Sequence, residues 1–263
     1  MTDLFAFGSA TQRLDAVGRY GTAGDLKKTQ YVMQLLGFPG DADTLKVLIV
    51  AAEKGIEIES GILDITQNIN KSEDYLSISP LGIMPALKEA HYQVAGDLGI
   101  ISFIEGRGLG NRMPPRNAAV LAEQNYWIDI ARNNVAPHVD AIMDEKVLKA
   151  MNKESIQADT DAIETARQAL DAPLNALDSQ LANKEFIVGD YSYADVHWTA
   201  YAHLLCVSGE QSLITQRNNL NQWLERIKRH KSFSGQKIVA YDLLPSLEDI
   251  QAKKLNDVVI TDF

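Results

Sequence analysis

Short apolar runs separated by longer amphipathic stretches mark the first part of the chain. Residues 31–36 form a bounded apolar run closed by Gly37, which is the pattern of a buried strand. Residues 44–54 have apolar positions that suit a helix packed on a sheet, and Gly55 follows where a left-handed cap is favourable. Residues 56–65 alternate apolar and polar side chains and predict a second strand. Because a helix intervenes, the two strands are expected to be parallel, in a βαβ unit.

Two apolar runs close together follow this unit. Residues 80–87 and 92–94 are separated by a tight connection, which suggests a hairpin. Helical periodicity returns at Asp97 and continues to about residue 105. Glycines at 106, 108 and 110 and prolines at 114 and 115 then interrupt regular structure. These glycines follow a helix rather than a strand, so a linker is favoured over a nucleotide-binding loop.

From residue 117 onward the periodicity is that of longer helices. Pro173 inside a helix costs about 3 kcal/mol, so one helix is expected to end near Asp171 and the next to begin there. The expected helices span 118–150, 153–170, 174–181, 192–207, 213–229 and, in the tail, 247–255. The predicted organisation is an extension over 1–30, an α/β domain over 31–108 and an all-helical domain over 117–263.

Charge and composition exclude several classes of function. The chain has 263 residues, with 35 acidic and 25 basic side chains, and its formal charge of −10 disfavours nucleic acid and anionic membranes as partners. One cysteine, Cys206, cannot form an internal disulfide, and the first 20 residues contain charges and no apolar segment typical of a signal peptide. The five histidines lack the paired spacing of a zinc site. A cytoplasmic protein without a metal is expected.

Four residue strings resemble the cytosolic glutathione S-transferase superfamily, over roughly residues 31–241. The most specific are the second, which contains Met84 and Pro85, and the fourth, which contains Ser192 and Asp195. The resemblance is nearest to bacterial members such as tetrachlorohydroquinone reductive dehalogenases. The strings are residues 44–49 with 53–55, 79–87, 96–101 and 186–195.

The resemblance implies a fold and a reaction. The fold is a thioredoxin-like α/β domain (βαβ-ββα) followed by an all-α domain, with the active site in the cleft between them. The co-substrate is glutathione, whose thiolate attacks a small hydrophobic electrophile in conjugation, lyase or dehalogenation chemistry. Pro85 is then expected to be cis, with the backbone of Met84 pairing with the cysteinyl part of glutathione. Ser192 and Asp195 are expected to form a capping box, which is a structural role.

The thiolate requires an activating group at the start of the first helix, where this chain departs from the family. Asp43 and Thr44 stand where relatives have a catalytic cysteine or serine, with Asp41 just before them. Thr44 can supply a hydroxyl, whereas Asp43 would raise the pKa of a neighbouring thiol. The alternative is that Asp43 and Thr44 are only an N-cap pair. Further candidate hydroxyls are Ser9, Tyr20 and Tyr31.

Two other contact positions also depart from the family. Where relatives bind the γ-glutamyl end with an acidic residue and a serine, this chain has Gly96 and Asp97, followed by Leu98. Asp97 either accepts the γ-glutamyl amine or serves as a plain N-cap. Ile83 occupies a position that is often polar, which leaves Lys46, Lys71 and Arg107 as candidates for the carboxylates of glutathione.

The helical domain offers a candidate substrate wall. Tyr126 and Trp127 lie on the first long helix, which lines the cleft in the family, and they are equally suited to the core. The family also implies a homodimer. The sequence therefore supports two alternative functions. One is a glutathione-dependent enzyme, and the other is a binding or regulatory protein that keeps the fold without the thiolate chemistry.

Overall fold

The fold is described from a computed structural model, which covers residues 33–107, 110, 112–152, 157–232 and 238–259. Val32–Phe263 group into one compact unit. The expected extension over 1–30 and the candidate hydroxyls of Ser9, Tyr20 and Tyr31 lie outside the described residues.

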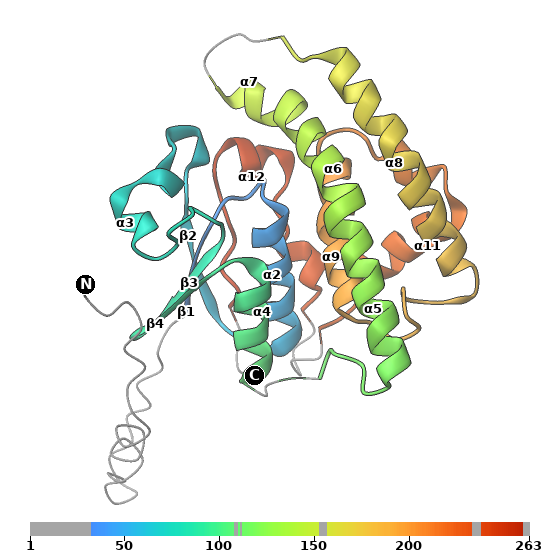
Figure 1. The fold of residues 1–263 in the computed structure, drawn as a ribbon, viewed down its shortest axis with the longest axis horizontal. Helices are drawn as coiled ribbons and strands as arrows, with labels where there is room; N and C mark the ends of the chain where they lie inside the picture. Colours follow the sequence, from blue (N-terminus) through green and yellow to red (C-terminus); the bar gives the residue numbers. More distant parts are fainter. Residues whose placement is uncertain (1–32, 108–109, 111, 153–156, 233–237, 260–263) are drawn as a thin grey trace, which may run out of the picture. The chain divides into compact units, whose positions relative to one another are not determined.

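A four-stranded mixed sheet, in the order β2-β1-β3-β4, organises the first part of this unit (Figure 1). β1 pairs in parallel with β2, and β3 pairs antiparallel with both β1 and β4. The predicted βαβ unit and hairpin are therefore confirmed, and with them the thioredoxin-like fold. The strands are β1 (Met33–Gly37), β2 (Ile58–Ile62), β3 (Ala86–Glu89) and β4 (Tyr92–Ala95).

The second strand is shorter than its apolar pattern predicts. β2 stops at Ile62 because Asp64 caps a 3-10 turn, η1 (Ile65–Gln67), by accepting from the Thr66 N–H. A second 3-10 turn, η2 (Ile69–Lys71), and a short helix, α3 (Glu73–Leu76), complete the connection to β3.

The helix α2 lies between the α/β part and the helical part of this unit. α2 (Ala42–Lys54) contacts both α4 (Asp97–Gly106) and α9 (Tyr193–Val207), as Figure 1 shows around the blue helix. Because α2 has neighbours on several sides, every one of its residues except Asp43 is buried. A polar side chain on α2 is therefore forced to find its partner inside the protein.

The long helix expected over 118–150 is present but is not uniform. It consists of α5 (Ala118–Ile130), α6 (Ala136–Met143) and α7 (Lys149–Met151), joined by two π-helical turns, η3 (Ala131–Val135) and η4 (Asp144–Leu148). Pro137 at the start of α6 has no N–H to donate, and the wider turn η3 immediately before it accommodates this loss.

The expected break at Pro173 is wrong. α8 (Thr160–Gln180) runs through Pro173, and Asp171 does not cap a new helix but forms an ion pair with Arg217 at 2.7 Å. Packing of Leu170, Leu174 and Leu177 on one face holds the helix together across the missing hydrogen bond. The helix begins only at Thr160, where Asp159 caps it, rather than at residue 153.

The remaining helices follow the predicted order with shorter bounds. The helix expected over 213–229 is divided at Gln216 and Arg217 into α10 (Ser212–Thr215) and α11 (Asn218–Ile227). The 3-10 turn η5 (Leu181–Asn183) follows α8 directly, and the tail contains the 3-10 turn η6 (Ala240–Leu243) and the helix α12 (Leu247–Gln251). Among the described helices, none has the length and apolar character needed to cross a membrane.

Candidate functional site

The peptide bond between Met84 and Pro85 is cis, as expected. The Pro85 carbonyl accepts from the Gly96 N–H at 2.8 Å, and the Tyr75 hydroxyl donates to the Ile83 carbonyl at 2.8 Å. These two bonds hold the segment on either side of Met84. Within the described part of the chain, the N–H and C=O of Met84 have no hydrogen-bond partner. This backbone edge is therefore available to pair with a peptide-like ligand.

The start of α2 differs from the expected N-cap pair of Asp43 and Thr44. The cap is Asp41, whose carboxylate accepts from the Thr44 N–H at 2.8 Å and from the Thr44 hydroxyl at 2.6 Å. An N-cap side chain reaches the residue three positions ahead, so a cap at Asp41 starts the helix at Ala42 instead of Thr44. Burial, followed by the negative charge of Asp43, raises the pKa of Asp41 to about 6.

The hydroxyl of Thr44 is fully engaged by these contacts. Thr44 is buried, its hydroxyl donates to Asp41, and it accepts from the Phe38 N–H at 3.3 Å. Its methyl and hydroxyl face the backbone of Gly37. The structure therefore turns Thr44 toward the end of β1, and its catalytic role stays a prediction.

A buried lysine lies one turn along α2. The Lys46 ammonium contacts the Asp43 carboxylate at 2.5 Å, the Tyr201 hydroxyl at 2.8 Å and the Asp97 carboxylate at 3.5 Å. Burial opposes its charge, but Tyr201, Asp43 and Asp97 together raise the pKa of Lys46 above its usual value. Lys46 is 0% exposed, so it holds the protein's own groups and is not placed to receive a ligand carboxylate.

The expected N-cap role of Asp97 is not observed. Gly96 is the N-cap residue of α4, and Asp97 is its first helical residue, with a carboxylate that accepts from the Leu98 N–H at 2.8 Å. The other carboxylate oxygen accepts from Arg132 at 2.8 Å. Burial alone would raise the pKa of Asp97, but Lys46 and Arg132 outweigh it and lower that pKa. Asp97 therefore carries a buried, compensated charge.

His197 completes the buried surroundings of Asp97. Its Nε2 atom lies 3.7 Å from the Asp97 carboxylate, and its Nδ1 atom donates to the Tyr193 carbonyl at 2.9 Å. Burial, and then the charge of Lys46, lower the pKa of His197 to about 3, so the ring is neutral at physiological pH. We refer to Lys46, Asp43, Asp97, Arg132 and Tyr201 as the Lys46 cluster.

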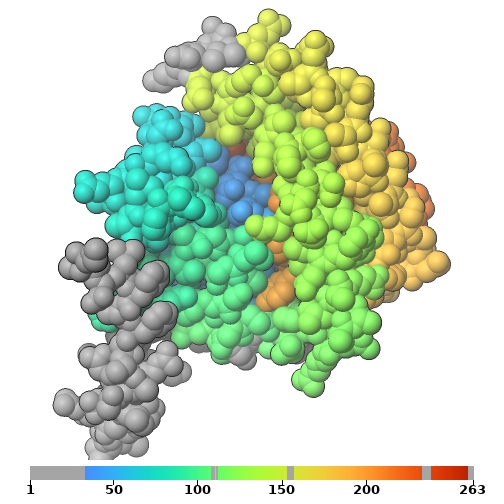
Figure 2. Space-filling view, in the orientation of Figure 1, coloured from blue at the N-terminus to red at the C-terminus, as the bar shows by residue number. Residues whose placement is uncertain are grey.

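A cavity of about 190 Å³ opens beside this cluster, at the N-terminus of α2. Figure 2 shows blue atoms of α2 at the floor of a hollow between the teal-to-green and yellow-green parts of the surface. We call it the cleft cavity, and it is lined by Asp41, Ala42, Asp43, Arg132, Ala136, Asp140 and Tyr201. Of the predicted catalytic pair it includes Asp43 and not Thr44.

Sequence reasoning missed most of the lining. Arg132, Ala136 and Asp140 recur every four residues, so they form one stripe along the helix, and this spacing could have been recognised. Tyr201 carries no such signal, because α9 is buried on nearly all sides and its polar positions have no periodic pattern. Only the contact with Lys46 identifies it.

The two aromatic candidates of the first long helix have different environments. Trp127 is buried, its carbonyl accepts from the Trp198 indole at 3.0 Å, and it belongs to the hydrophobic core. Tyr126 is 60% exposed and contacts Trp127 edge to face. Neither residue lines the cleft cavity. Their assignment as a substrate wall stays a prediction.

The other candidate cations are already bound to the protein. Lys71 donates to the Leu81 carbonyl at 3.4 Å, and Arg107 pairs with Glu89 and lies over the Phe103 ring. Ile83 is half exposed. Within the described residues, no set of His, Cys, Asp or Glu side chains is arranged to hold a metal ion.

The capping box of Ser192 and Asp195 is confirmed. Asp195 accepts from both the N–H and the hydroxyl of Ser192, at 3.0 and 3.2 Å. It also accepts from the Ile187 N–H at 3.1 Å and from the Trp223 indole at 2.9 Å. Burial raises the pKa of Asp195 to about 6 although all of these donors lower it. Its role is structural, as predicted.

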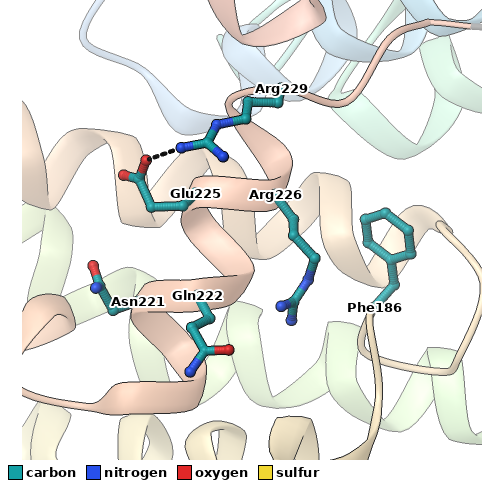
Figure 3. Close-up of a pocket in the computed structure, with 6 residues that line it drawn as sticks. All are labelled: Phe186, Asn221, Gln222, Glu225, Arg226 and Arg229. Atoms are coloured by element: carbon teal, nitrogen blue, oxygen red, sulfur yellow. Dashed lines mark ion pairs between the residues drawn. The ribbon is translucent and has the colours of Figure 1, made fainter.

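A larger hollow of about 480 Å³ lies on the outer face of α11 (Figure 3). Its lining includes Phe186, Gln222 and Arg226, together with the ion pair of Glu225 with Arg229 at 3.6 Å. The Arg226 guanidinium already donates to the carbonyls of Glu185 and Lys184. Because none of the predicted site residues lines this hollow, the cleft cavity is the better candidate site.

Comparisons with known proteins agree with this architecture. Residues 31–95 match the model of the glutathione S-transferase N-terminal domain, and residues 138–231 match that of the C-terminal domain. Glutathione S-transferase F10 of Arabidopsis thaliana is 23% identical over 190 residues, which are 71% of this chain and 87% of the relative.

Solved structures show the same fold. Glutathione transferase F7 of Populus trichocarpa superposes with a TM-score of 0.69 at 23% identity, covering 78% of this chain and 97% of its own. A glutathione transferase family member from Pseudomonas fluorescens, solved with two glutathione bound, gives a TM-score of 0.65 at 18% identity and covers 78% and 92% of the two chains.

Proposed function

The chain belongs to the glutathione S-transferase family, and from that membership we propose that it joins the sulfur of glutathione to a small hydrophobic electrophile. The observation that carries this proposal is the unpaired backbone of Met84 beside a cis proline. In the proposal this backbone pairs with the cysteinyl part of glutathione, as the family resemblance implies. Conjugation, lyase and dehalogenation reactions all begin with this thiolate.

The thiol then lies at the N-terminus of α2. A helix N-terminus favours a nearby negative charge by roughly 0.3–1 kcal/mol, which supports the thiolate form. The carboxylates of Asp41 and Asp43 line the same cavity and oppose that effect. We propose that Asp43, held by Lys46, is the nearer of the predicted catalytic pair to the thiol, and that Thr44 acts through Asp41.

The charged ends of glutathione require a cation that reaches the cavity. Arg132 lines the cleft cavity and its side chain is 34% exposed, whereas the side chain of Lys46 is fully buried. We propose that Arg132 receives a glutathione carboxylate while Asp97, next to Leu98, holds the guanidinium in place. Arginine suits this role because its planar group can bind two carboxylates at once.

Binding of glutathione is tested by thermal unfolding. Glutathione at about 100 times its Kd stabilises the folded state by about 2.7 kcal/mol, so the melting temperature is expected to rise by several degrees. S-methylglutathione is expected to produce a similar shift and to be inactive, since it keeps the backbone and lacks a free thiol. Arg132→Gln is expected to weaken binding about tenfold. Arg229→Gln, at a side chain outside the cleft cavity, is the matched control.

Turnover is tested with a panel of electrophiles that includes nitroaryl halides, alkyl halides, haloquinones, epoxides and enones. No melting shift at millimolar glutathione, together with no turnover on this panel, would overturn the proposal in favour of a binding protein. A shift without turnover would retain glutathione as a ligand and reject the transferase reaction.

We also propose a homodimer acting in a reducing compartment such as the cytoplasm. Three large apolar side chains near the start of α4 and the cis proline are exposed, and such side chains are candidates for a subunit interface: Leu81, Ile83 and Leu98. Sedimentation of the purified chain tests the dimer, and a monomer at micromolar concentration would contradict it.

A further inference from the structure

We propose that Tyr201 is a catalytic hydrogen-bond donor that stabilises the oxygen of the electrophile as the thiolate attacks. This inference rests on the proposed glutathione transfer and goes beyond it, because it assigns a substrate class and a residue of the helical half. The preferred electrophiles are those that place negative charge on oxygen, namely epoxides and α,β-unsaturated carbonyl compounds.

Tyr201 lines the cleft cavity, which opens at the N-terminus of α2 where the thiol is expected. It belongs to α9, and it lines the same cavity as Asp41, Ala42 and Asp43 at the N-terminus of α2. An electrophile in this cavity would therefore lie close to both the thiol and Tyr201. The residue is 3% exposed, so its ring is fixed by packing.

The hydrogen bonds of Tyr201 determine whether its hydroxyl can donate a hydrogen bond to a ligand or only accept one. The Lys46 ammonium donates to the Tyr201 oxygen at 2.8 Å, and an ammonium group can only donate. Within the described part of the chain, the proton of this hydroxyl has no acceptor. The hydroxyl can therefore donate to a bound ligand.

Lys46 is the positioning residue for this donor. Its ammonium also contacts Asp43 at 2.5 Å and lies 4.6 Å from the centroid of the Tyr201 ring. A cation bonded to the oxygen of a hydroxyl polarises its O–H bond and strengthens it as a donor. Burial raises the pKa of Tyr201, although Lys46 lowers it, so the hydroxyl keeps its proton at neutral pH.

The reaction balances without any further reagent. The sulfur lone pair forms a C–S bond, and either the C–O bond of an epoxide breaks or the π electrons of an enone move onto its carbonyl oxygen. The oxygen that gains the electron pair accepts the Tyr201 hydrogen bond and then takes a proton from water, equivalent to the proton released by the thiol. An alkyl halide instead loses a halide ion, which needs no proton.

The experiment compares two electrophiles in Tyr201→Phe. The kcat/KM for an epoxide or enone is divided by the kcat/KM for a primary alkyl iodide, each with saturating glutathione. Removing one donor to a developing oxyanion lowers turnover by roughly 10²–10³ in well-characterised sites, so the ratio is expected to fall at least tenfold. The change is expected in kcat, because the charge develops only in the transition state.

Tyr241→Phe is the matched control. The Tyr241 hydroxyl contacts Nδ1 of His203 at 3.1 Å, and His203 lies on α9, as Tyr201 does. Tyr241 does not line the cleft cavity, so removing its hydroxyl is expected to leave the ratio unchanged. A ratio in Tyr201→Phe equal to that of the wild type would overturn the inference. A wild-type protein inactive with both electrophiles would instead reject the proposed function.

A second measurement applies if Tyr201→Phe does not fold. Incorporation of 3-fluorotyrosine throughout the chain makes every phenol more acidic with little change of size. The epoxide-to-iodide ratio is expected to rise in the fluorinated protein, and to rise equally in fluorinated Tyr241→Phe. An unchanged ratio would contradict a hydroxyl donor in the transition state.

Discussion

Asp41 and Asp43 are two positions apart, yet their carboxylates have different tasks. Asp41 is occupied by the amide and hydroxyl of Thr44, as the cap of α2. Asp43 lies on the outer side of the helix, with 31% of its side chain exposed, and bonds Lys46. The difference follows from helix geometry, because a cap faces the first-turn amides, whereas the residue two positions later projects sideways.

The charge of Asp43 is expected to influence the thiol of bound glutathione. Asp43→Asn removes a negative charge and leaves Lys46 less compensated, so the pKa of the thiol is expected to fall by about 0.5–1 unit. Thiolate absorbance titrated against pH in the binary complex measures this shift. Asp129→Asn is the control, since its carboxylate bonds the exposed Asn133 and does not line the cavity.

An unchanged thiol pKa in Asp43→Asn would place the thiol away from the start of α2. Thr44→Ala distinguishes the remaining candidate. If Thr44 contacts the sulfur directly, turnover falls while the thiol pKa rises. If it acts only as the partner of Asp41, the main result is lower stability.

The two capping boxes show how burial changes the contribution of one local motif to stability. The boxes at the starts of α9 and α12 contain the same residue types, a serine followed three positions later by an aspartate. Asp195 is fully buried, whereas Asp249 lies near the surface. Asp195 also binds the Ile187 amide and the Trp223 indole, which joins α9 to α11.

Asp195→Ala is therefore expected to lower the free energy of unfolding by about 3 kcal/mol or more. Capping alone would account for about 1–2 kcal/mol, and the rest arises because buried donors lose their acceptor. Urea unfolding measures the change. Asp249→Ala, in the exposed box, is expected to show a much smaller loss. Equal losses in the two variants would contradict a role for Asp195 beyond capping.

The histidine of α9 that holds the C-terminal segment makes this packing dependent on pH. His203 Nε2 donates to the Pro245 carbonyl at 2.8 Å, and burial lowers the pKa of His203 to about 4. Its folded-state pKa lies below the value of about 6.5 in an unfolded chain. The stabilisation is therefore complete above pH about 6.5 and is lost as the pH falls toward 4.

His203→Gln is expected to remove this contribution while keeping a donor for Pro245. Between pH 7.5 and pH 4.5 the wild type should lose about 2 kcal/mol more unfolding free energy than the variant. His197, whose pKa is lowered to about 3, remains in both proteins and leaves a residual slope. Parallel pH dependences of the two proteins would show that His203 is not held neutral.

At the scale of the whole molecule, the Lys46 cluster joins the two halves of the fold. Lys46 is on α2 and Asp97 on α4, whereas Arg132 and Tyr201 belong to the helical half. A buried ion pair contributes little net stability when complete, but removing one partner leaves an uncompensated charge. A single substitution in the cluster is therefore expected to cost more stability than the complete cluster contributes.

Lys46→Met is expected to lower the free energy of unfolding by about 3 kcal/mol. Lys228→Met removes a lysine whose partner, Glu225, is exposed, and is expected to have little effect. Adding Asp97→Asn to Lys46→Met should recover part of the loss, because the carboxylate left behind is then neutral. Additive losses in the double variant would contradict the coupling of these two residues.

The sequence alone determined the features that have a local cause. The strand and helix periodicities predicted the βαβ unit, the hairpin and the helical half. The family resemblance of the strings around Pro85 and Ser192 implied the thioredoxin-like fold, a cis bond and a capping box, and the structure confirms all of these. In each case, residues within a few positions of one another fix the backbone.

Tertiary structure decided the chemistry of the candidate site. The pattern could not tell that Asp41, rather than Asp43 or Thr44, caps α2, because aspartate and threonine both favour that position. Nor could it place Tyr201, which meets Lys46 across 155 positions of the chain. Pro173 shows the same limit, since packing of α8 overrides its local preference. Contacts between distant segments leave no periodic signal, so only the folded chain shows which polar groups share the cleft.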